Sequence, residues 1–246
     1  MKRINWLATL GFALIALSAL LYLVHYAIFR DAHHIFIYLL GDLAFLPIEV
    51  LLVTLIIHRL LTDQERRAML KKLNMVIGAF LSEVGTNLIK ACLSFDTHPE
   101  VIRDEMMVTT DWTDQQFSRA IKRSRDYDFK IDSRNGDLDR LRRFLVTKRE
   151  FLLRLLENPN VLGHETVTEL LWAVFHLTEE LAFRADVTRL PESDYDHLSG
   201  DMKRAYGHLV FQWLAYMRHL RDDYPYLYSL AVRTNPFNPN ASPEVT

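Results

Sequence analysis

The sequence predicts an all-α protein in which a two-helix transmembrane hairpin is followed by a cytoplasmic multi-helix bundle domain. Three observations predict this class. Two apolar stretches near the N-terminus are each long enough to cross a bilayer, because about 20 apolar residues span its hydrocarbon core. The rest of the chain repeats apolar residues at helical spacing, and no stretch alternates as a strand does. Basic residues flank the open end of the hairpin rather than its loop.

The first apolar stretch runs from Ile4 to Phe29 and contains no charged residue. A signal peptide has a shorter apolar core, of about 7 to 15 residues, and a small-residue cleavage site, which is not clear here. We therefore expect an uncleaved helix over about 4–29. One side of this helix carries small or hydrogen-bonding residues, Tyr22 and His25 among them, and is expected to meet a second helix closely.

The second apolar stretch predicts a helix over 35–61 and carries two carboxylates, Asp42 and Glu49. These residues are seven positions apart and so lie within about 20° of one another on a helix. A charged carboxylate at the centre of a membrane helix costs about 2.5 to 3.5 kcal/mol, so both should face protein or water. A polar contact between helices and an ion or proton pathway both fit this arrangement. A hairpin would place Tyr22 and His25 near the depth of Asp42, where a hydrogen bond or ion pair could form.

The basic residues predict the orientation of the hairpin. The loop contains one basic residue, Arg30. The open end is flanked by Lys2, Arg3, Arg59, Arg66, Arg67, Lys71 and Lys72. Cytoplasmic segments beside membrane helices carry an excess of Lys and Arg. We therefore expect a two-pass protein integral to the inner cell membrane, residues 1–61 in the lipid bilayer and both termini in the cytoplasm.

A juxtamembrane helix is expected over 62–95. Thr62 and Glu65 have the spacing of a capping box, which predicts that a new helix begins where the membrane ends. Apolar residues then recur every seven positions, with two glycines beside them, and the candidates for helix packing are Leu70, Ile77, Gly78, Val84 and Gly85. An oligomerisation stalk and ordinary core packing within one subunit both fit this stripe.

The cytoplasmic helical domain is expected over 96–232, with helices at about 114–127, 137–157, 164–185, 193–223 and 224–232. Thr113, with Gln116 three positions on, is expected to cap the first of these helices. The sequence does not decide whether the helix over 193–223 is interrupted at Ser199 and Gly200. A Pro/Asn-rich tail follows over 233–246, expected to dock onto the domain, with a peptide motif for a partner as the alternative. Residues 116–154 hold 12 Lys and Arg against 6 Asp and Glu, whereas 155–201 hold 2 against 10. These regions could pair within one subunit or between subunits.

Composition and motifs exclude several functions. The chain has 246 residues, a formal net charge of -2 and one cysteine, Cys92. This near-neutral charge does not favour nucleic acid as a partner, and one cysteine cannot form an intrachain disulfide. No phosphate-binding glycine loop, dinucleotide fingerprint or nucleophile elbow occurs. We therefore assign no catalytic residue and no cofactor.

Two helices carry histidine and carboxylate stripes that resemble dimetal sites in helical bundles. The weak metal-ligand candidates are Glu169, His176, Glu180, His208 and His219. On both helices these residues lie opposite the apolar face, whereas a bundle metal site points inward. We therefore assign no metal from sequence alone.

Three functions follow, in order of preference. The first is a membrane-anchored, self-associating, non-enzymatic scaffold, sensor or regulator that acts through its cytoplasmic helices, with a cytoplasmic protein as a further partner candidate. The second is a small oligomeric ion channel or proton pathway that uses Asp42 and Glu49. The third is a metal-dependent enzyme at the histidine stripes.

Overall fold

The computed structural model describes residues 2–245, and for residues 2–5, 7 and 67 it describes the backbone alone. This described range is helical and forms no strand, although one isolated antiparallel bridge joins Asp96 to Ile131. The chain divides into two compact units, Met1–Arg66 and Arg67–Thr246, which we call the hairpin unit and the helical domain. The side chains of Lys2, Arg3 and Arg67, which enter the orientation argument, lie outside the described part.

The hairpin unit contains α1 (Lys2–Phe29) and the first part of α2 (Ala32–Phe80). Arg30 joins them with a positive φ of 50°, the left-handed conformation that ends a helix and turns the chain. The carboxylate of Asp31 then accepts hydrogen bonds from the backbone N–H groups of His33 and His34, at 2.9 and 3.3 Å. This cap explains why α2 begins earlier than residue 35.

The prediction that a new helix starts at Thr62 is wrong, because α2 passes through this position without a break. The Thr62 hydroxyl donates a hydrogen bond to the carbonyl of His58, one turn earlier, at 2.9 Å. A threonine inside a helix can bond in this way and then needs no N-cap role. The apolar helix and the expected juxtamembrane helix therefore share one continuous backbone.

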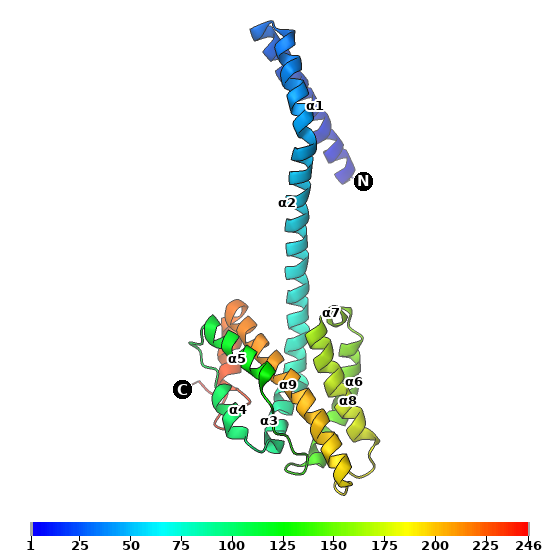
Figure 1. The fold of residues 1–246 in the computed structure, drawn as a ribbon, viewed down its shortest axis with the longest axis vertical. Helices are drawn as coiled ribbons and strands as arrows, with labels where there is room; N and C mark the ends of the chain where they lie inside the picture. The colour runs from blue at the N-terminus through cyan, green and yellow to red at the C-terminus, as the bar shows by residue number, and fades with distance from the viewer. Residues whose placement is uncertain (1, 246) are drawn as a thin grey trace. The chain divides into compact units, whose positions relative to one another are not determined.

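The helical domain begins within α2 and continues through nine further helical segments (Figure 1). In chain order these are η1 (Leu81–Gly85), a short π-helix, then α3 (Thr86–Phe95), α4 (Pro99–Glu105), α5 (Asp114–Asp126), α6 (Leu138–Leu156), α7 (Pro159–Leu162), α8 (Glu165–Phe183), α9 (Glu192–Asp223) and α10 (Pro225–Arg233). The long helix α9 is the centre of the domain, since α3, α5, α8 and α10 all pack against it. Helix α6 packs against α8.

Local signals explain several helix starts. Thr113 accepts a hydrogen bond from the backbone of Gln116, whose side chain accepts one from the backbone of Thr113, so the capping box expected at α5 is confirmed. The Asp137 side chain accepts a hydrogen bond from the N–H of Arg140 at 2.8 Å and so caps α6. The interruption at Ser199 and Gly200, which the sequence leaves undecided, does not occur, and α9 runs through both residues.

The contact between the apolar faces of α8 and α9 forms a large part of the core. Among the almost fully buried residues of α8 and α9 are Val167, Leu170, Leu171, Val174, Leu177, Leu181, Leu198, Met202, Tyr206, Leu209, Val210, Trp213, Leu214, Met217 and Leu220. Each fully buried side chain of this kind stabilises the fold by about 1.5 to 3 kcal/mol. This contact fixes the relative register of the two helices.

The C-terminal tail docks onto the domain. Phe237 is fully buried and packs edge-on against Trp213, with ring centroids 5.1 Å apart. The side-chain amide of Asn235 donates a hydrogen bond to the carbonyl of Met106 at 2.8 Å. Docking within the chain therefore accounts for Phe237 and Asn235 of the tail.

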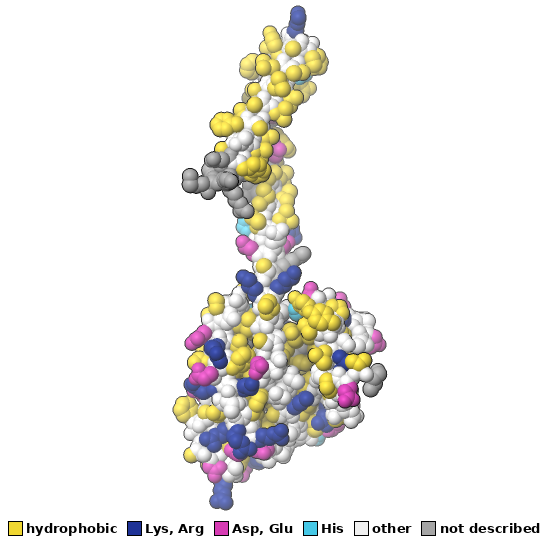
Figure 2. Space-filling view, turned by 180° about the vertical axis from the view of Figure 1, so that it is seen from behind, with side chains coloured by type: hydrophobic (Ala, Val, Ile, Leu, Met, Phe, Trp, Pro, Cys, Tyr) yellow, Lys and Arg dark blue, Asp and Glu magenta, His cyan; other side chains and the backbone are white. Residues whose placement is uncertain are grey.

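Charged residues of the helical domain pair within the chain. Arg134 forms ion pairs with Glu192 and Asp196, each at 2.7 Å, and Arg149 pairs with Glu179 at 2.7 Å. The basic region 116–154 therefore contacts the acidic region 155–201 inside one subunit. On the face shown in Figure 2, charged side chains of both signs spread over this domain, whereas hydrophobic side chains cover most of the hairpin unit.

Candidate functional site

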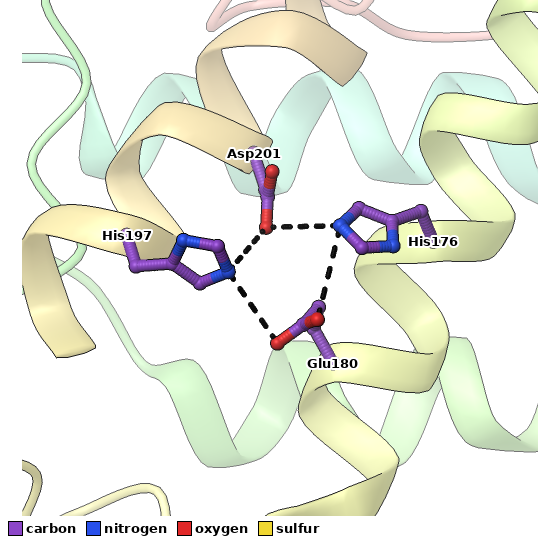
Figure 3. Close-up of side chains that lie close together, drawn as sticks. All are labelled: His176, Glu180, His197 and Asp201. Atoms are coloured by element: carbon purple, nitrogen blue, oxygen red, sulfur yellow. Dashed lines mark ion pairs between the residues drawn. The ribbon is translucent and has the colours of Figure 1, made fainter.

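Four side chains of the helical domain converge between α8 and α9 (Figure 3). Helix α8 contributes His176 and Glu180, and α9 contributes His197 and Asp201. One nitrogen or oxygen atom from each residue lies within 4.8 Å of those of the other three. We call these residues the His/carboxylate cluster.

Helical spacing and antiparallel packing create the cluster. Each helix presents a histidine and a carboxylate four positions apart, which places both on one face. The contacts between the helices then follow one register. Glu169 of α8 lies 3.9 Å from His208 of α9. His176, seven positions after Glu169 on α8, lies 3.4 Å from Asp201, which is seven positions before His208 on α9. The sequence pattern supplies the pairs, and the packing of α8 against α9 joins them.

The Nε2 atoms of both imidazoles point to the same carboxylate oxygen. Asp201 Oδ2 lies 3.4 Å from Nε2 of His176 and 3.3 Å from Nε2 of His197. The two Glu180 oxygens complete the ring of atoms, with Oε1 3.8 Å from Nε2 of His176 and Oε2 3.6 Å from Nε2 of His197.

Burial is uneven across the cluster. The side chain of Asp201 is only 3% exposed, and its Oδ2 atom is buried without a hydrogen-bond partner. The side chains of His176 and His197 are 45% and 52% exposed. The cluster is therefore a buried carboxylate covered by two accessible imidazoles.

Two arginines hold the carboxylates. Arg204 donates a hydrogen bond to Oδ1 of Asp201 at 2.9 Å, which leaves Oδ2 facing the imidazoles. Arg184 donates to Glu180 Oε2 at 2.7 Å and to Asp194 Oδ1 at 2.6 Å. The hydrogen bond from Arg184 lowers the pKa of the Glu180 carboxyl below its ordinary value. Glu180 is therefore ionised at neutral pH and fixed in orientation.

The structure brings only part of the predicted histidine stripes together. Glu169 and His208 face one another beside the cluster, and His219 pairs instead with Asp223 at 2.8 Å. His197 and Asp201 are not among the candidates from sequence, although their spacing of four is the same signal as in His176 and Glu180. The sequence places the stripe of α8 opposite the apolar face of that helix, whereas in the structure His176 and Glu180 border the contact with α9.

The predicted intramembrane residues lie in the hairpin unit. Tyr22, His25 and Asp42 line one cavity of about 580 Å³ between α1 and α2. His34 lines the same cavity, and its ring stacks on that of His25 with centroids 5.8 Å apart. Within the described residues, His25 and Asp42 share this cavity without forming an ion pair. Glu49 is exposed and does not line it.

The predicted oligomer-packing residues are mostly buried within the chain. Ile77 and Val84 belong to the core of the helical domain, at 2% and 0% exposure. A Cβ atom at Gly78 would collide with the hydroxyl of Tyr216, and one at Gly85 would lie 2.6 Å from Leu81 Cδ2. Leu70 alone of the five keeps an exposed side chain, at 38%. In this conformation the stripe packs within one subunit.

Comparison with known proteins places the whole arrangement in one family. Residues 2–61 match an N-terminal helical domain, and residues 69–233 match a C-terminal helical domain, both described for MJ1433. The chain is 47% identical over 234 residues to the uncharacterized protein MJ1433 of Methanocaldococcus jannaschii, a match that covers 95% of this chain and 94% of that protein. No solved structure matches the chain. The chain therefore belongs to the MJ1433 family, and it carries both of the helical domains described for MJ1433.

Proposed function

We propose that the protein is a two-pass integral membrane protein whose helical domain works at the cytoplasmic face as a sensor or regulator rather than as an enzyme. One observation carries the membrane part of this proposal. Both α1 and α2 contain a stretch that is long and apolar enough to cross a membrane, and none of the residues in the most apolar window of either helix is buried within the chain.

This exposure argues against the soluble alternative. The apolar core helix of a soluble protein is covered by its own chain, whereas here large side chains such as Leu17 and Leu52 are 52% and 50% exposed. A contiguous apolar surface of this length indicates contact with a membrane or another protein. A signal sequence could account for α1 but not for α2, which continues into the helical domain.

The orientation part rests on the basic residues. Arg59, Arg66, Lys71 and Lys72 follow the apolar part of α2, against Arg30 alone in the loop. The excess of Lys and Arg on cytoplasmic segments then favours a cytoplasmic helical domain. The proposed regulatory role is supported by helix α2, because this one helix contributes residues to both the hairpin unit and the helical domain. Self-association and a cytoplasmic protein partner remain part of the proposal.

Membrane fractionation tests this proposal. The full chain should sediment with membranes and resist extraction by alkaline carbonate. The double variant Leu17→Arg, Leu52→Arg should lose this resistance, since a charge at the centre of a membrane helix costs about 2.5 to 3.5 kcal/mol. Leu162→Arg is the matched control, because Leu162 is 62% exposed in the helical domain, and it should behave as the wild type. Carbonate extraction of the unaltered chain would contradict the proposal.

A proton or ion pathway is the second candidate function. The cavity that Tyr22, His25 and Asp42 line between α1 and α2 favours it, because ionisable groups within a membrane span commonly mark such paths. Asp42 is the residue expected to contact the proton or ion. Glu49 lies outside this cavity and offers a direct comparison.

A further inference from the structure

We propose that the His/carboxylate cluster binds one divalent transition-metal ion of the zinc class, with His176, Glu180, His197 and Asp201 as its ligands. The proposal goes beyond the proposed function and depends on the packing of α8 against α9, not on the membrane. It would supply the ligand that a sensory or regulatory domain requires.

The spacing of the candidate ligand atoms fits one bound ion. Zinc binds imidazole nitrogen and carboxylate oxygen at about 2.0 to 2.2 Å, so ligand atoms at the corners of a tetrahedron lie about 3.3 to 3.6 Å apart. Asp201 Oδ2 lies 3.4 and 3.3 Å from the Nε2 atoms of His176 and His197, and the two oxygens of Glu180 lie 3.8 and 3.6 Å from these same nitrogens. With one ligand atom from each residue, all four atoms lie within 4.8 Å of one another. Small side-chain adjustments would therefore close the ligand shell without moving either helix.

The buried carboxylate oxygen of Asp201 is a second, independent observation that points to a bound cation. Its side chain is 3% exposed, and Oδ2 has no hydrogen-bond partner, although the Nε2 atoms of His176 and His197 lie within 3.4 Å. Buried polar atoms of this kind are rare and call for an ion, a water or strain. Because both imidazoles are near Oδ2 and neither donates to it, a simple network of protonated histidines explains the geometry poorly. A cation among the three atoms satisfies all of them.

Two arginines orient the carboxylates of the cluster but do not neutralise all of the negative charge around it. Arg204 binds the far oxygen of Asp201, and Arg184 bridges Glu180 and Asp194. Metal-binding carboxylates are usually oriented by outer hydrogen bonds of this kind. Three carboxylates face two guanidinium groups here, so the cluster stays net negative while its imidazoles are neutral.

The ligand types select the class of metal. Two imidazoles with two carboxylates suit Zn²⁺ and neighbouring divalent ions such as Co²⁺, whereas Ca²⁺ and Mg²⁺ prefer oxygen alone. The exposed imidazoles leave a path for the ion from solvent. His176 and Arg204 also line an open cavity of about 850 Å³, which reaches the side of the cluster.

Cobalt binding to the full chain in detergent, purified without a histidine tag and stripped with a chelator, tests the proposal. We expect one Co²⁺ per chain, with the visible d–d bands of four-coordinate cobalt, displaced by Zn²⁺. His176→Ala and His197→Ala should each weaken binding by more than about 100-fold, because loss of an outer partner alone costs about 10- to 100-fold. His208→Ala is the matched control on α9, since His208 faces Glu169 outside the cluster, and should bind as the wild type.

Two results would overturn the proposal. One is a wild-type chain that shows no d–d bands at millimolar Co²⁺. The other is His197→Ala binding as tightly as the wild type, or His208→Ala losing as much affinity as His197→Ala. Circular dichroism and melting of the metal-free variants check folding. If His197→Ala is unfolded at the assay temperature, His197→Gln keeps the bulk of the side chain and answers the same question.

Discussion

Asp201 and His176 lie on different helices, yet Oδ2 of the first is 3.4 Å from Nε2 of the second. This oxygen is buried and has no hydrogen-bond partner. We predict that Asp201→Asn stabilises the metal-free chain by about 1 kcal/mol at pH 8, because a buried orphan polar group costs about 1 to 3 kcal/mol and the new amide can donate to a neutral imidazole. The lost ion pair with Arg204, 57% exposed, offsets only about 0 to 1 kcal/mol.

With zinc present, the wild type should be more stable than Asp201→Asn, because a metal that binds only the folded state stabilises that state. Unfolding in urea of the full chain in detergent, with and without Zn²⁺, measures both effects. Asp196→Asn is the control, because Asp196 is 71% exposed in an ion pair with Arg134 and should change the free energy of unfolding by less than about 1 kcal/mol. A metal-free Asp201→Asn chain that is less stable than the wild type would argue against an unsatisfied carboxylate.

Replacing Gly85 by alanine and replacing Gly200 by alanine should change the stability of the helical domain in opposite directions. A Cβ atom at Gly85 would lie 2.6 Å from Leu81 and 3.3 Å from Leu209, whereas one at Gly200 meets nothing within 4 Å. Overpacking costs about 1 to 3 kcal/mol, so Gly85→Ala should destabilise the helical domain. Gly200→Ala should stabilise α9 by about 0.5 to 1 kcal/mol, because alanine loses less entropy in a helix. Melting temperatures that moved the same way for both variants would contradict this packing.

Cys92 should be unreactive in the folded chain. Burial, with a smaller effect from Asp96, raises the pKa of its thiol to about 12, and its side chain is fully buried. The thiolate is the reactive form, so at pH 8 almost none is present. Ellman's reagent should react with the chain in denaturant and not in detergent alone. Rapid reaction of the folded chain would place Cys92 at an accessible surface.

Substitutions of the two carboxylates in the apolar part of α2, Asp42 and Glu49, should differ in effect. Asp42 lines the cavity between α1 and α2, and Glu49 does not. If the hairpin conducts protons, Asp42→Asn should lower the pH-driven proton flux into proteoliposomes and Glu49→Gln should leave it close to wild type. Equal flux from the wild type, Asp42→Asn and protein-free vesicles would remove the pathway as a function.

The helices of this chain could be predicted from local signals because those signals act over a few residues. The spacing of apolar residues located α5, α6, α8, α9 and α10 to within a few positions, and the capping box at Thr113 marked the start of α5. The similar pattern at Thr62 failed because the preceding residues are already helical, so that the Thr62 hydroxyl bonds back to His58. The same residues cap a helix or continue one, depending on the chain before them.

The His/carboxylate cluster could be predicted only in part. His176 and Glu180 stand out from their helical spacing, and His197 and Asp201 have the same spacing on α9. What the sequence does not contain is the register of α8 against α9, which the packing of many apolar side chains decides together. Burial of Asp201 follows from that register and not from its neighbours in the chain.

Cysteine accessibility in intact cells tests the central claim most directly, namely that the hairpin unit is embedded in the membrane and the helical domain is cytoplasmic. In a Cys92→Ala background, one variant carries Ala32→Cys at the start of α2 and another carries Glu244→Cys in the exposed tail. A membrane-impermeant maleimide should label Ala32→Cys in intact cells and Glu244→Cys only after the membrane is opened. Labelling of Glu244→Cys in intact cells, or of both variants in the soluble fraction, would contradict the account.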